Sequence, residues 1–231
     1  FFDYLDQPVK RVTGAWAPPT VSRVLERAAL AGEDEIAREL MAMLRDSACP
    51  CPERRPCNAM LSFEGKTVLI SGAAGGIGAE TARILSGLGA DLALCDLEGC
   101  DDLADELRDS GTSVATAAFD IRDRAQAEAF IGAQPRLDAI VANAGFCPWD
   151  DWNDGDWDDT FDRVVDINLK GVINVMRPAI ARMIAQKHGN AVLVASVAGR
   201  MGGLRASPHD VSAKGGVMSM TKWMAAKADP H

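Results

Sequence analysis

The sequence predicts an α/β fold in which a parallel sheet is covered by helices on both of its faces. Three observations predict it. Short apolar runs alternate with amphipathic stretches from residue 60 onward, a glycine-rich string follows the first apolar run, and an acidic residue ends the second. Strands buried on both faces are continuously apolar, as these runs are, and the sheets they form are parallel. We therefore expect a doubly wound sheet with the strand order 3-2-1-4-5.

The first elements are predicted from two different periodicities. The apolar run TVLIS at 67–71 is typical of a buried strand, and apolar residues then recur at helical spacing over 76–88. DLALCD at 91–96 predicts the second strand, and 101–110 predicts a helix with a polar face. SVATAAF at 113–119 predicts the third strand.

The same alternation continues to the end of the chain. A helix is predicted over 124–133, a strand over 139–144, a long helix over 156–185, a strand over 191–196 and a last helix over 211–228. The residues Asp-Pro-His that follow are typical of a turn. We therefore expect the C-terminal strands of the sheet to be missing from this sequence.

The chain divides into three parts. Residues 46–59, which hold three Pro and three Cys without periodicity, predict a linker. They separate an N-terminal appendage at 1–45 from the α/β domain at 60–231. The cysteines Cys49, Cys51 and Cys57 could suggest zinc, but three thiols with no nearby His make a poor ligand set. We predict no metal site.

Composition excludes several classes of partner. The 231 residues carry a net charge of -9, which argues against nucleic acid and anionic membranes because both need clustered Lys and Arg. No apolar run approaches the roughly 20 residues of a membrane span. Cys95, Cys100 and Cys147 lie in apolar surroundings and are interpreted as buried thiols in a reducing compartment. The expected location is the cytoplasm.

The glycine-rich string predicts a dinucleotide site. It joins the first strand to the first helix, where glycines allow a tight turn, close approach to a pyrophosphate and close packing of helix on strand. The helix N-terminus then offers free N–H groups and partial positive charge to the phosphates. Asp96 ends the second strand and can accept hydrogen bonds from ribose hydroxyls, which favours NAD over NADP. The alternative is a structural glycine turn with a chance Asp. We interpret 60–231 as an NAD-binding Rossmann domain.

From residue 61 onward the sequence resembles the short-chain dehydrogenase/reductase family. Its Ser-Gly-x-x-x-Gly-Ile-Gly motif matches 71–78, and its Asn-Ala-Gly motif matches 143–145. The resemblance implies that Asp120 meets the adenine amine and that Asn168 holds a proton-relay water. The cofactor-binding residues implied in this way are Gly72, Gly76, Ile77, Gly78, Asp96, Asp120, Ile121, Asn143, Ala144, Gly145 and Lys214.

The resemblance also implies a catalytic set, and one member is replaced. Family members use a Ser that polarises the substrate oxygen, a Tyr that exchanges its proton and a Lys four residues after the Tyr. Ser196 and Lys214 match the first and third, but Asp210 occupies the Tyr position. The only tyrosine is Tyr4, in the unrelated N-terminal segment.

This replacement leaves two functions open. Asp210 lies one helical turn before Lys214, so we expect an ordinary ion pair that keeps it ionised, without a proton to give. Loss of a general acid typically costs about 10²–10⁴-fold in rate. His209 is a weak candidate substitute because adjacent helix residues do not share a face. The chain is then an impaired NAD-dependent oxidoreductase acting on a secondary alcohol and ketone, or a catalytically inactive cofactor-binding pseudoenzyme with an assembly or regulatory role.

Residues 149–162 hold three Trp and seven Asp. Their spacing misses that of a calcium loop, and Gly155-Asp156 is better interpreted as the start of the long helix. The Trp residues either line the substrate entrance or pack on the surface.

Family resemblance further implies a homodimer or homotetramer through the helices at 156–185 and 211–228.

The N-terminal appendage has a resemblance of its own. Its residues 4–14, YLDQPVKRVTG, are similar to the closing stretch of the β subunit of a 2-oxoacid dehydrogenase E1 component. The next residues, 15–19, depart from that family's pattern. A segment of this length cannot bury a core of its own.

Overall fold

The computed structural model describes residues 62–148, 150–202 and 207–228. The predictions for the appendage, the linker and the Cys49 cluster fall outside these residues. In the described part of the chain, no helix is long and apolar enough to cross a membrane, and no three His, Cys, Asp or Glu side chains are grouped to hold a metal ion.

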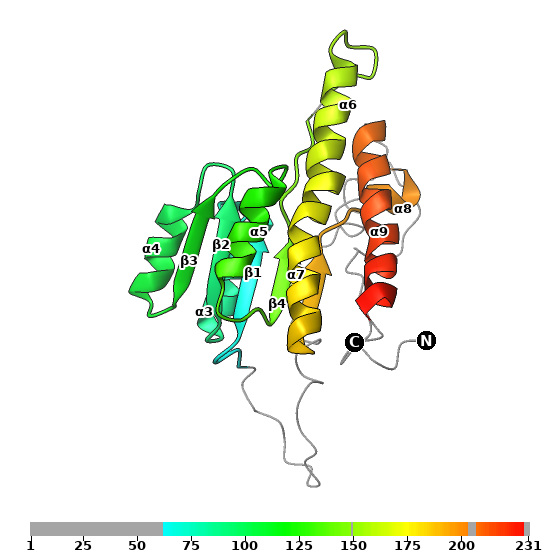
Figure 1. Ribbon diagram of the computed structural model, residues 1–231. Coiled ribbons are helices and arrows are strands. Elements are labelled where there is room, and N and C mark those ends of the chain that lie inside the picture. The colour runs from blue at the N-terminus through cyan, green and yellow to red at the C-terminus, as the bar shows by residue number, and fades with distance from the viewer. Residues whose placement is uncertain (1–61, 149, 203–206, 229–231) are drawn as a thin grey trace, which may run out of the picture.

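The described strands form one parallel sheet of five (Figure 1), and the predicted order is confirmed: β3-β2-β1-β4-β5. The central strands are buried along their whole length because helices cover both faces, which is why they are continuously apolar. The strands are β1 Thr67–Ser71, β2 Asp91–Asp96, β3 Val114–Ala118, β4 Ala139–Ala142 and β5 Asn190–Leu193.

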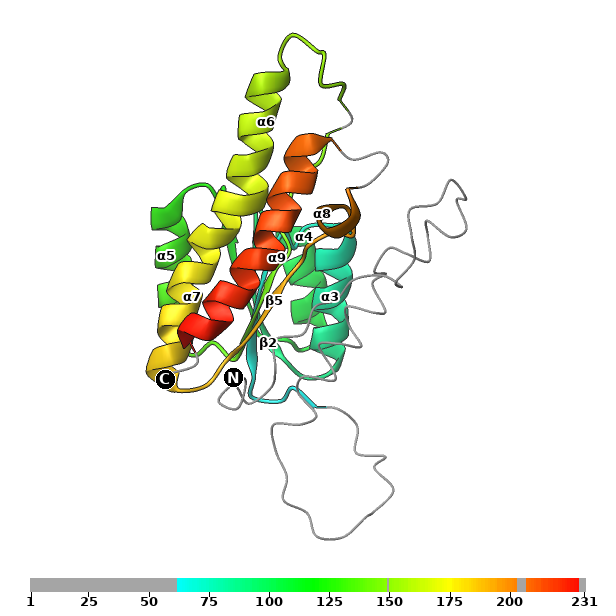
Figure 2. The same ribbon diagram turned by 90° about the vertical axis from the view of Figure 1, so that its right-hand side faces the viewer.

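The helices divide between the two faces (Figure 2). On one face α3 and α4 pack Leu85 and Leu103 against β1 and β2, and on the other α5, α7 and α9 pack Ile131, Met176 and Val217 against the sheet. Each face therefore has its own apolar core. The helices are α3 Gly76–Gly87, α4 Asp101–Asp109, α5 Arg124–Ala133, α6 Trp157–Val165, α7 Val172–Gln186, α8 Ala198–Met201 and α9 Pro208–Ala228.

The predicted long helix at 156–185 is interrupted. Between α6 and α7 the chain forms a π-helical segment, η1, at Asp166–Gly171. Such a segment contains one extra residue per turn and is frequent at functional sites. Hydrophobic periodicity does not reveal one extra residue, so the sequence shows a continuous helix. The helix α8 was likewise not predicted, because its four residues are too few to show a period.

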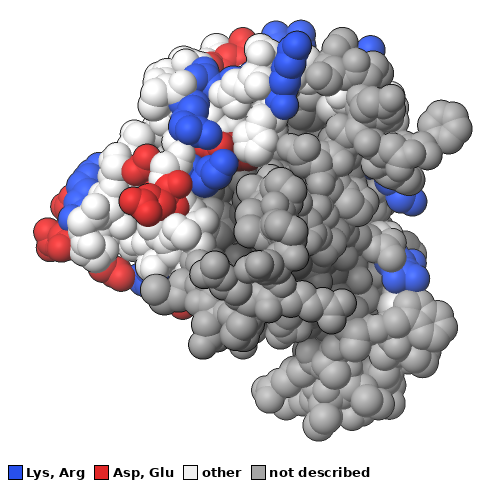
Figure 3. Space-filling view, turned by 90° about the horizontal axis from the view of Figure 1, so that it is seen from below, with Lys and Arg blue, Asp and Glu red and all other residues white. Residues whose placement is uncertain are grey.

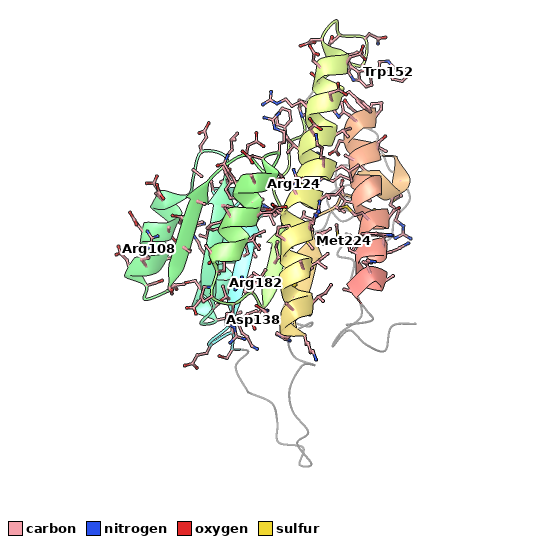
Figure 4. All side chains as sticks on the ribbon, in the orientation of Figure 1. Arg108, Arg124, Asp138, Trp152, Arg182 and Met224 are labelled. Carbon is pink, nitrogen blue, oxygen red and sulfur yellow. The ribbon has the colours of Figure 1, made fainter. Side chains whose placement is uncertain are left out.

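The amino ends of the strands meet at a buried carboxylate. Asp138 precedes β4 and is 1% exposed. Its carboxylate accepts hydrogen bonds from Thr67 N at 2.9 Å and from the Arg136 guanidinium, and it lies 3.6 Å from Lys66 Nζ and 3.4 Å from His188 Nε2. Figure 4 shows Asp138 at the end of the sheet opposite to Trp152. Seen from this end (Figure 3), Lys and Arg side chains lie beside Asp and Glu side chains.

We expect this cluster to make folding stability depend on acid pH. Burial alone would raise the pKa of Asp138, but the hydrogen bonds from Arg136 and Thr67 N prevail and lower it. A lowered folded-state pKa adds stability that is fully present above the ordinary Asp pKa of about 3.9 and is lost as pH falls through the folded value. Asp138→Asn should therefore cost about 1–3 kcal/mol in free energy of unfolding at neutral pH, and progressively less below about pH 4.

Urea unfolding of both proteins between neutral and acid pH measures this difference. Asp109→Asn removes the same charge from an exposed site at the end of α4 and serves as the control. A cost that stays constant across the pH range, or that Asp109→Asn shares, would contradict the assignment.

Candidate active site

The glycine loop lies between β1 and α3 and is tightly packed. Gly72 has φ +68°, and a Cβ there would lie 2.6 Å from Ala144 Cα. A Cβ on Gly78 would lie 2.0 Å from Gly72 O. Only glycine fits at either position, so the loop closely approaches the chain that follows β4. Parallel register places Ser71 beside Cys95 and Ala142, which brings the carboxyl ends of β1, β2 and β4 to this edge.

The N-terminus of α3 is open toward a ligand. Its N-cap is Gly75, no side chain caps it, and its first turn holds no acidic residue. A Cβ on Gly75 or Gly76 would meet no described residue within 4 Å. Unpaired N–H groups, partial positive charge and free space suit a pyrophosphate. The residues present therefore fit the phosphates of a dinucleotide.

Asp96 lies beside this loop. Its Oδ2 accepts a hydrogen bond from Ala74 N at 2.8 Å, and its Oδ1 accepts one from Leu97 N at 2.7 Å. The carboxylate thus connects the end of β2 to the glycine loop. Its role toward a ribose stays a prediction.

The chain after β4 is held against the glycine loop. Ser71 Oγ accepts hydrogen bonds from Asn143 N and Ala144 N, and Asn143 Nδ2 donates to Gly72 O at 2.9 Å. A Cβ on Gly145 would lie 3.3 Å from both Asn168 Oδ1 and Lys214 Nζ. The Asn-Ala-Gly motif therefore lies between the predicted cofactor cradle and the predicted catalytic residues.

The predicted adenine contact lies at the end of β3. Asp120 accepts hydrogen bonds from Arg122 N and from the Arg122 guanidinium, and these bonds lower its pKa. Ile121 is buried under Gly171, where a Cβ would lie 2.7 Å from Ile121 Cδ1. Asn174 Nδ2 donates to Ile121 O at 3.0 Å. The loop is thus rigidly anchored on α7, and its contact with adenine stays a prediction.

Asn168 lies in η1 and is 1% exposed. Its Oδ1 accepts a hydrogen bond from Phe146 N at 2.7 Å, and its Nδ2 donates to Phe146 O at 2.8 Å. The same Nδ2 donates to Asp210 Oδ1 at 3.0 Å. The π-helical turn therefore directs this amide to both the chain after β4 and the start of α9.

The expected ion pair between Asp210 and Lys214 is not formed. No carboxylate oxygen of Asp210 lies within 4.0 Å of Lys214 Nζ, although both residues are described. Lys214 Nζ instead donates to Val194 O at 3.1 Å, and Asp210 binds Asn168. Helical spacing made the pair plausible, but α9 packs against η1 and against the chain that follows β5. Polar groups of these two segments bind the two side chains instead. Burial lowers the pKa of Lys214 against the opposing effect of Asp210.

Ser196 lies in the loop after β5, and residues before and after it in the chain lie against Lys214. Its Oγ accepts a hydrogen bond from Ala198 N at 3.1 Å and donates none to another described residue. On one side, Val194 O binds Lys214 Nζ; on the other, a Cβ on Gly199 would lie 3.0 Å from Lys214 Cβ. The loop that contains Ser196 is therefore packed against Lys214, on the same helix as Asp210, which bonds to Asn168 of η1.

A second cluster beside this site was not predicted. Asp150 Oδ1 accepts a hydrogen bond from Ser207 Oγ at 2.5 Å, and its Oδ2 lies 2.9 Å from His209 Nε2. His209 is 0% exposed, and its ring lies against Trp157 and Phe161 of α6. This cluster anchors the chain before α6 to the start of α9. No sequence signal announces it, because Asp150 and His209 are 59 residues apart.

The aromatic and cysteine predictions have mixed outcomes. Trp157 packs against His209, whereas Trp152 is 67% exposed at the tip before α6 (Figure 4). Asp156 is the N-cap of α6 as expected, but its side chain makes no capping hydrogen bond.

Cys95 and Cys100 are buried, and burial raises their pKa to about 12 and about 11. The prediction of a buried Cys147 is wrong, because the chain runs over the edge of the sheet there and leaves the thiol exposed.

The sequence model of the short chain dehydrogenase family matches residues 66–231. The chain therefore belongs to the short-chain dehydrogenase/reductase family. It is similar to the oxidoreductase UcpA of Salmonella typhimurium, with 36% identity over 174 residues, which are 72% of this chain and 65% of the relative. It is also similar to the 3-oxoacyl-[acyl-carrier-protein] reductase FabG of Rickettsia felis, with 32% identity over 165 residues, 71% of this chain and 66% of the relative.

Solved structures show the same fold. The carveol dehydrogenase of Mycobacterium avium in complex with NAD has a TM-score of 0.68 and 29% identity, covering 73% of this chain and 67% of that one. A 3-oxoacyl-[acyl carrier protein] reductase of Brucella melitensis with bound NAD has a TM-score of 0.68 and 30% identity, covering 79% of this chain and 73% of that one. The match to the UcpA relative spans only 65% of that protein's length.

Proposed function

We propose that this chain carries the cofactor and catalytic site of an NAD-dependent oxidoreductase that interconverts a secondary alcohol and a ketone, and that Asp210 impairs this reaction. Two observations carry the proposal. Asn168 bonds to the residue at position 210, and the loop that contains Ser196 binds Lys214 next to the glycine cradle. Family membership supports the reaction class, and the NAD-bound structural neighbours support the cofactor.

Each residue has a proposed task. The glycine loop and the N-terminus of α3 bind the pyrophosphate, Asp96 binds the adenosine ribose, and Lys214 binds the second ribose. Bound NAD would supply the hydride chemistry. Ser196 donates its hydroxyl proton to the substrate oxygen and holds that oxygen in place. Asp210 replaces the phenol hydroxyl that a tyrosine at this position would offer to a developing alkoxide.

The second candidate function is a cofactor-binding pseudoenzyme with an assembly or regulatory role. One observation favours it: Asp210 is 5% exposed and bonded to Asn168, so its carboxylate is part of the packed structure. Restoring a tyrosine at position 210 separates the two functions, as argued in the Discussion.

The cofactor preference gives a direct test. We expect the protein to bind NADH more tightly than NADPH, because the Asp96 carboxylate repels a 2′-phosphate. Asp96→Ala should reduce that preference by about tenfold, although it also removes the acceptor for Ala74 N. Titration calorimetry with both cofactors measures the ratio. Asp109→Asn is the control for net charge.

Tighter binding of NADPH by the unaltered protein would exclude the proposed role of Asp96. Failure to bind either cofactor would exclude the cofactor site as a whole. Equal weakening of both cofactors by Asp96→Ala would show that Asp96 only braces the glycine loop.

We further propose a small alcohol or ketone as the substrate, a cytoplasmic location and a homodimer or homotetramer. The exposed side chains of Ile173 on α7 and Trp223 on α9, which are 38% and 65% exposed, support an association through these helices. Large exposed apolar side chains often mark such surfaces.

A further inference from the structure

The carboxylate of Asp210 lies inside the candidate active site, and among the described residues only one of its oxygens has a hydrogen-bond partner. Its Oδ1 accepts the hydrogen bond from Asn168 Nδ2, while its Oδ2 has no hydrogen bond to any described residue. Lys214 Nζ is directed to Val194 O and does not neutralise it at close range. Asp210 is 5% exposed, and in such a buried place an ionised carboxylate attracts a cation more strongly than it would in water.

The charges around it reinforce this preference. The charges of Asp210, Asp150 and Lys214 all act on the Cys147 thiol. Two carboxylates and one ammonium therefore lie around the same point. The hydrogen bonds from Ser207 and His209 lower the pKa of Asp150, which keeps it ionised. Two carboxylates against one ammonium make the surroundings of this point negative on balance.

Reduction of a ketone does not suit such a site. When hydride adds to the carbonyl carbon, the electron pair of the C=O bond moves to oxygen, and this alkoxide needs a proton. A neighbouring carboxylate repels the developing negative charge and supplies no proton.

Reduction of an iminium ion suits it well. Bound NADH would supply the hydride for the new C–H bond, the electron pair of the C=N bond would move to nitrogen, and the positive charge would disappear. The products are a neutral tertiary amine and NAD⁺, and no proton is consumed. In the reverse direction the carboxylate stabilises the iminium cation as it forms.

We propose that Asp210 adapts this site to amine and iminium substrates. Their reacting centre carries a positive charge, which the carboxylate favours and a tyrosine would not. The inference rests on the proposed NAD site but not on ketone activity. It assigns Asp210 a contact with the substrate in place of the missing proton transfer.

A binding experiment without turnover is the first test. The NADH-loaded protein is titrated by calorimetry with piperidine, which is protonated at neutral pH, and with tetrahydropyran, its neutral analogue of the same shape. We expect piperidinium to bind at least about tenfold more tightly, and Asp210→Asn to remove that difference. Asn keeps an oxygen that can accept from Asn168, so the fold is preserved. Asp109→Asn, which changes net charge equally at a distance, should leave the difference unchanged.

Turnover is the second test. The N-methyl dihydroisoquinolinium ion carries a fixed charge, and tetralone is a ketone of nearly the same shape. Loss of NADH absorbance should be faster with the iminium ion than with the ketone, and Asp210→Asn should slow only the former. Asp210→Tyr should reverse the preference.

The outcomes are distinguishable. Failure to bind NADH overturns the cofactor site on which the inference rests. NADH binding with equal affinity for piperidinium and tetrahydropyran overturns the inference alone. Ammonium binding that survives Asp210→Asn overturns the role of Asp210.

Discussion

Asp210→Tyr is expected to raise alcohol and ketone turnover by about 10²-fold or more, the range usual for one general acid. The phenol would lie one turn before Lys214 on α9, near Asn168. Lys214 would favour the phenolate, Ser196 would hold the substrate oxygen, and the phenol would complete the proton path. The measurement is formation or loss of NADH against a panel of small secondary alcohols and ketones.

Asp210→Phe is the matched control for this experiment. It introduces nearly the same bulk into a position that is 5% exposed, but it has no hydroxyl group. We expect it to bind NADH and stay inactive. If the Tyr variant binds NADH and is as inert as the Phe variant, the impaired-enzyme proposal fails and the pseudoenzyme becomes the better explanation.

Gly78→Ala is expected to abolish detectable NADH binding and to lower thermal stability. The added Cβ would lie 2.0 Å from Gly72 O and 2.9 Å from Asn143 Nδ2. Gly72 cannot yield, because it has φ +68° and is itself in contact with Ala144. Overpacking of this kind costs about 1–3 kcal/mol or more, and every 1.4 kcal/mol lost from binding is tenfold in affinity.

Gly87→Ala is the control, since it lies at the end of the same helix, α3, and its Cβ would meet no described residue within 4 Å. NADH titration and thermal melting of both variants separate a local effect from general unfolding. A Gly78→Ala protein that binds NADH as tightly as the unaltered chain would contradict the assignment of this loop as the cofactor cradle.

Local patterns carried most of the fold prediction. The strands at 67–71 and 91–96 and the helix at 124–133 have the predicted bounds, because apolar runs and helical periodicity are properties of consecutive residues. The glycine motif could be recognised for the same reason, since its spacing reflects one turn between one strand and one helix. The interruption at η1 could not, because one extra residue barely changes the pattern.

The sequence by itself determined the parallel sheet, its strand order, the glycine loop and the absence of tyrosine from position 210. Only the tertiary structure decided what the residue at 210 contacts. Asp210 and Asn168 are 42 residues apart, and the contact forms because η1 and α9 pack together. Asp150 and His209 meet for the same reason across 59 residues. Such contacts depend on how whole elements pack, and a spacing of four along one helix wrongly suggested that Asp210 would pair with Lys214.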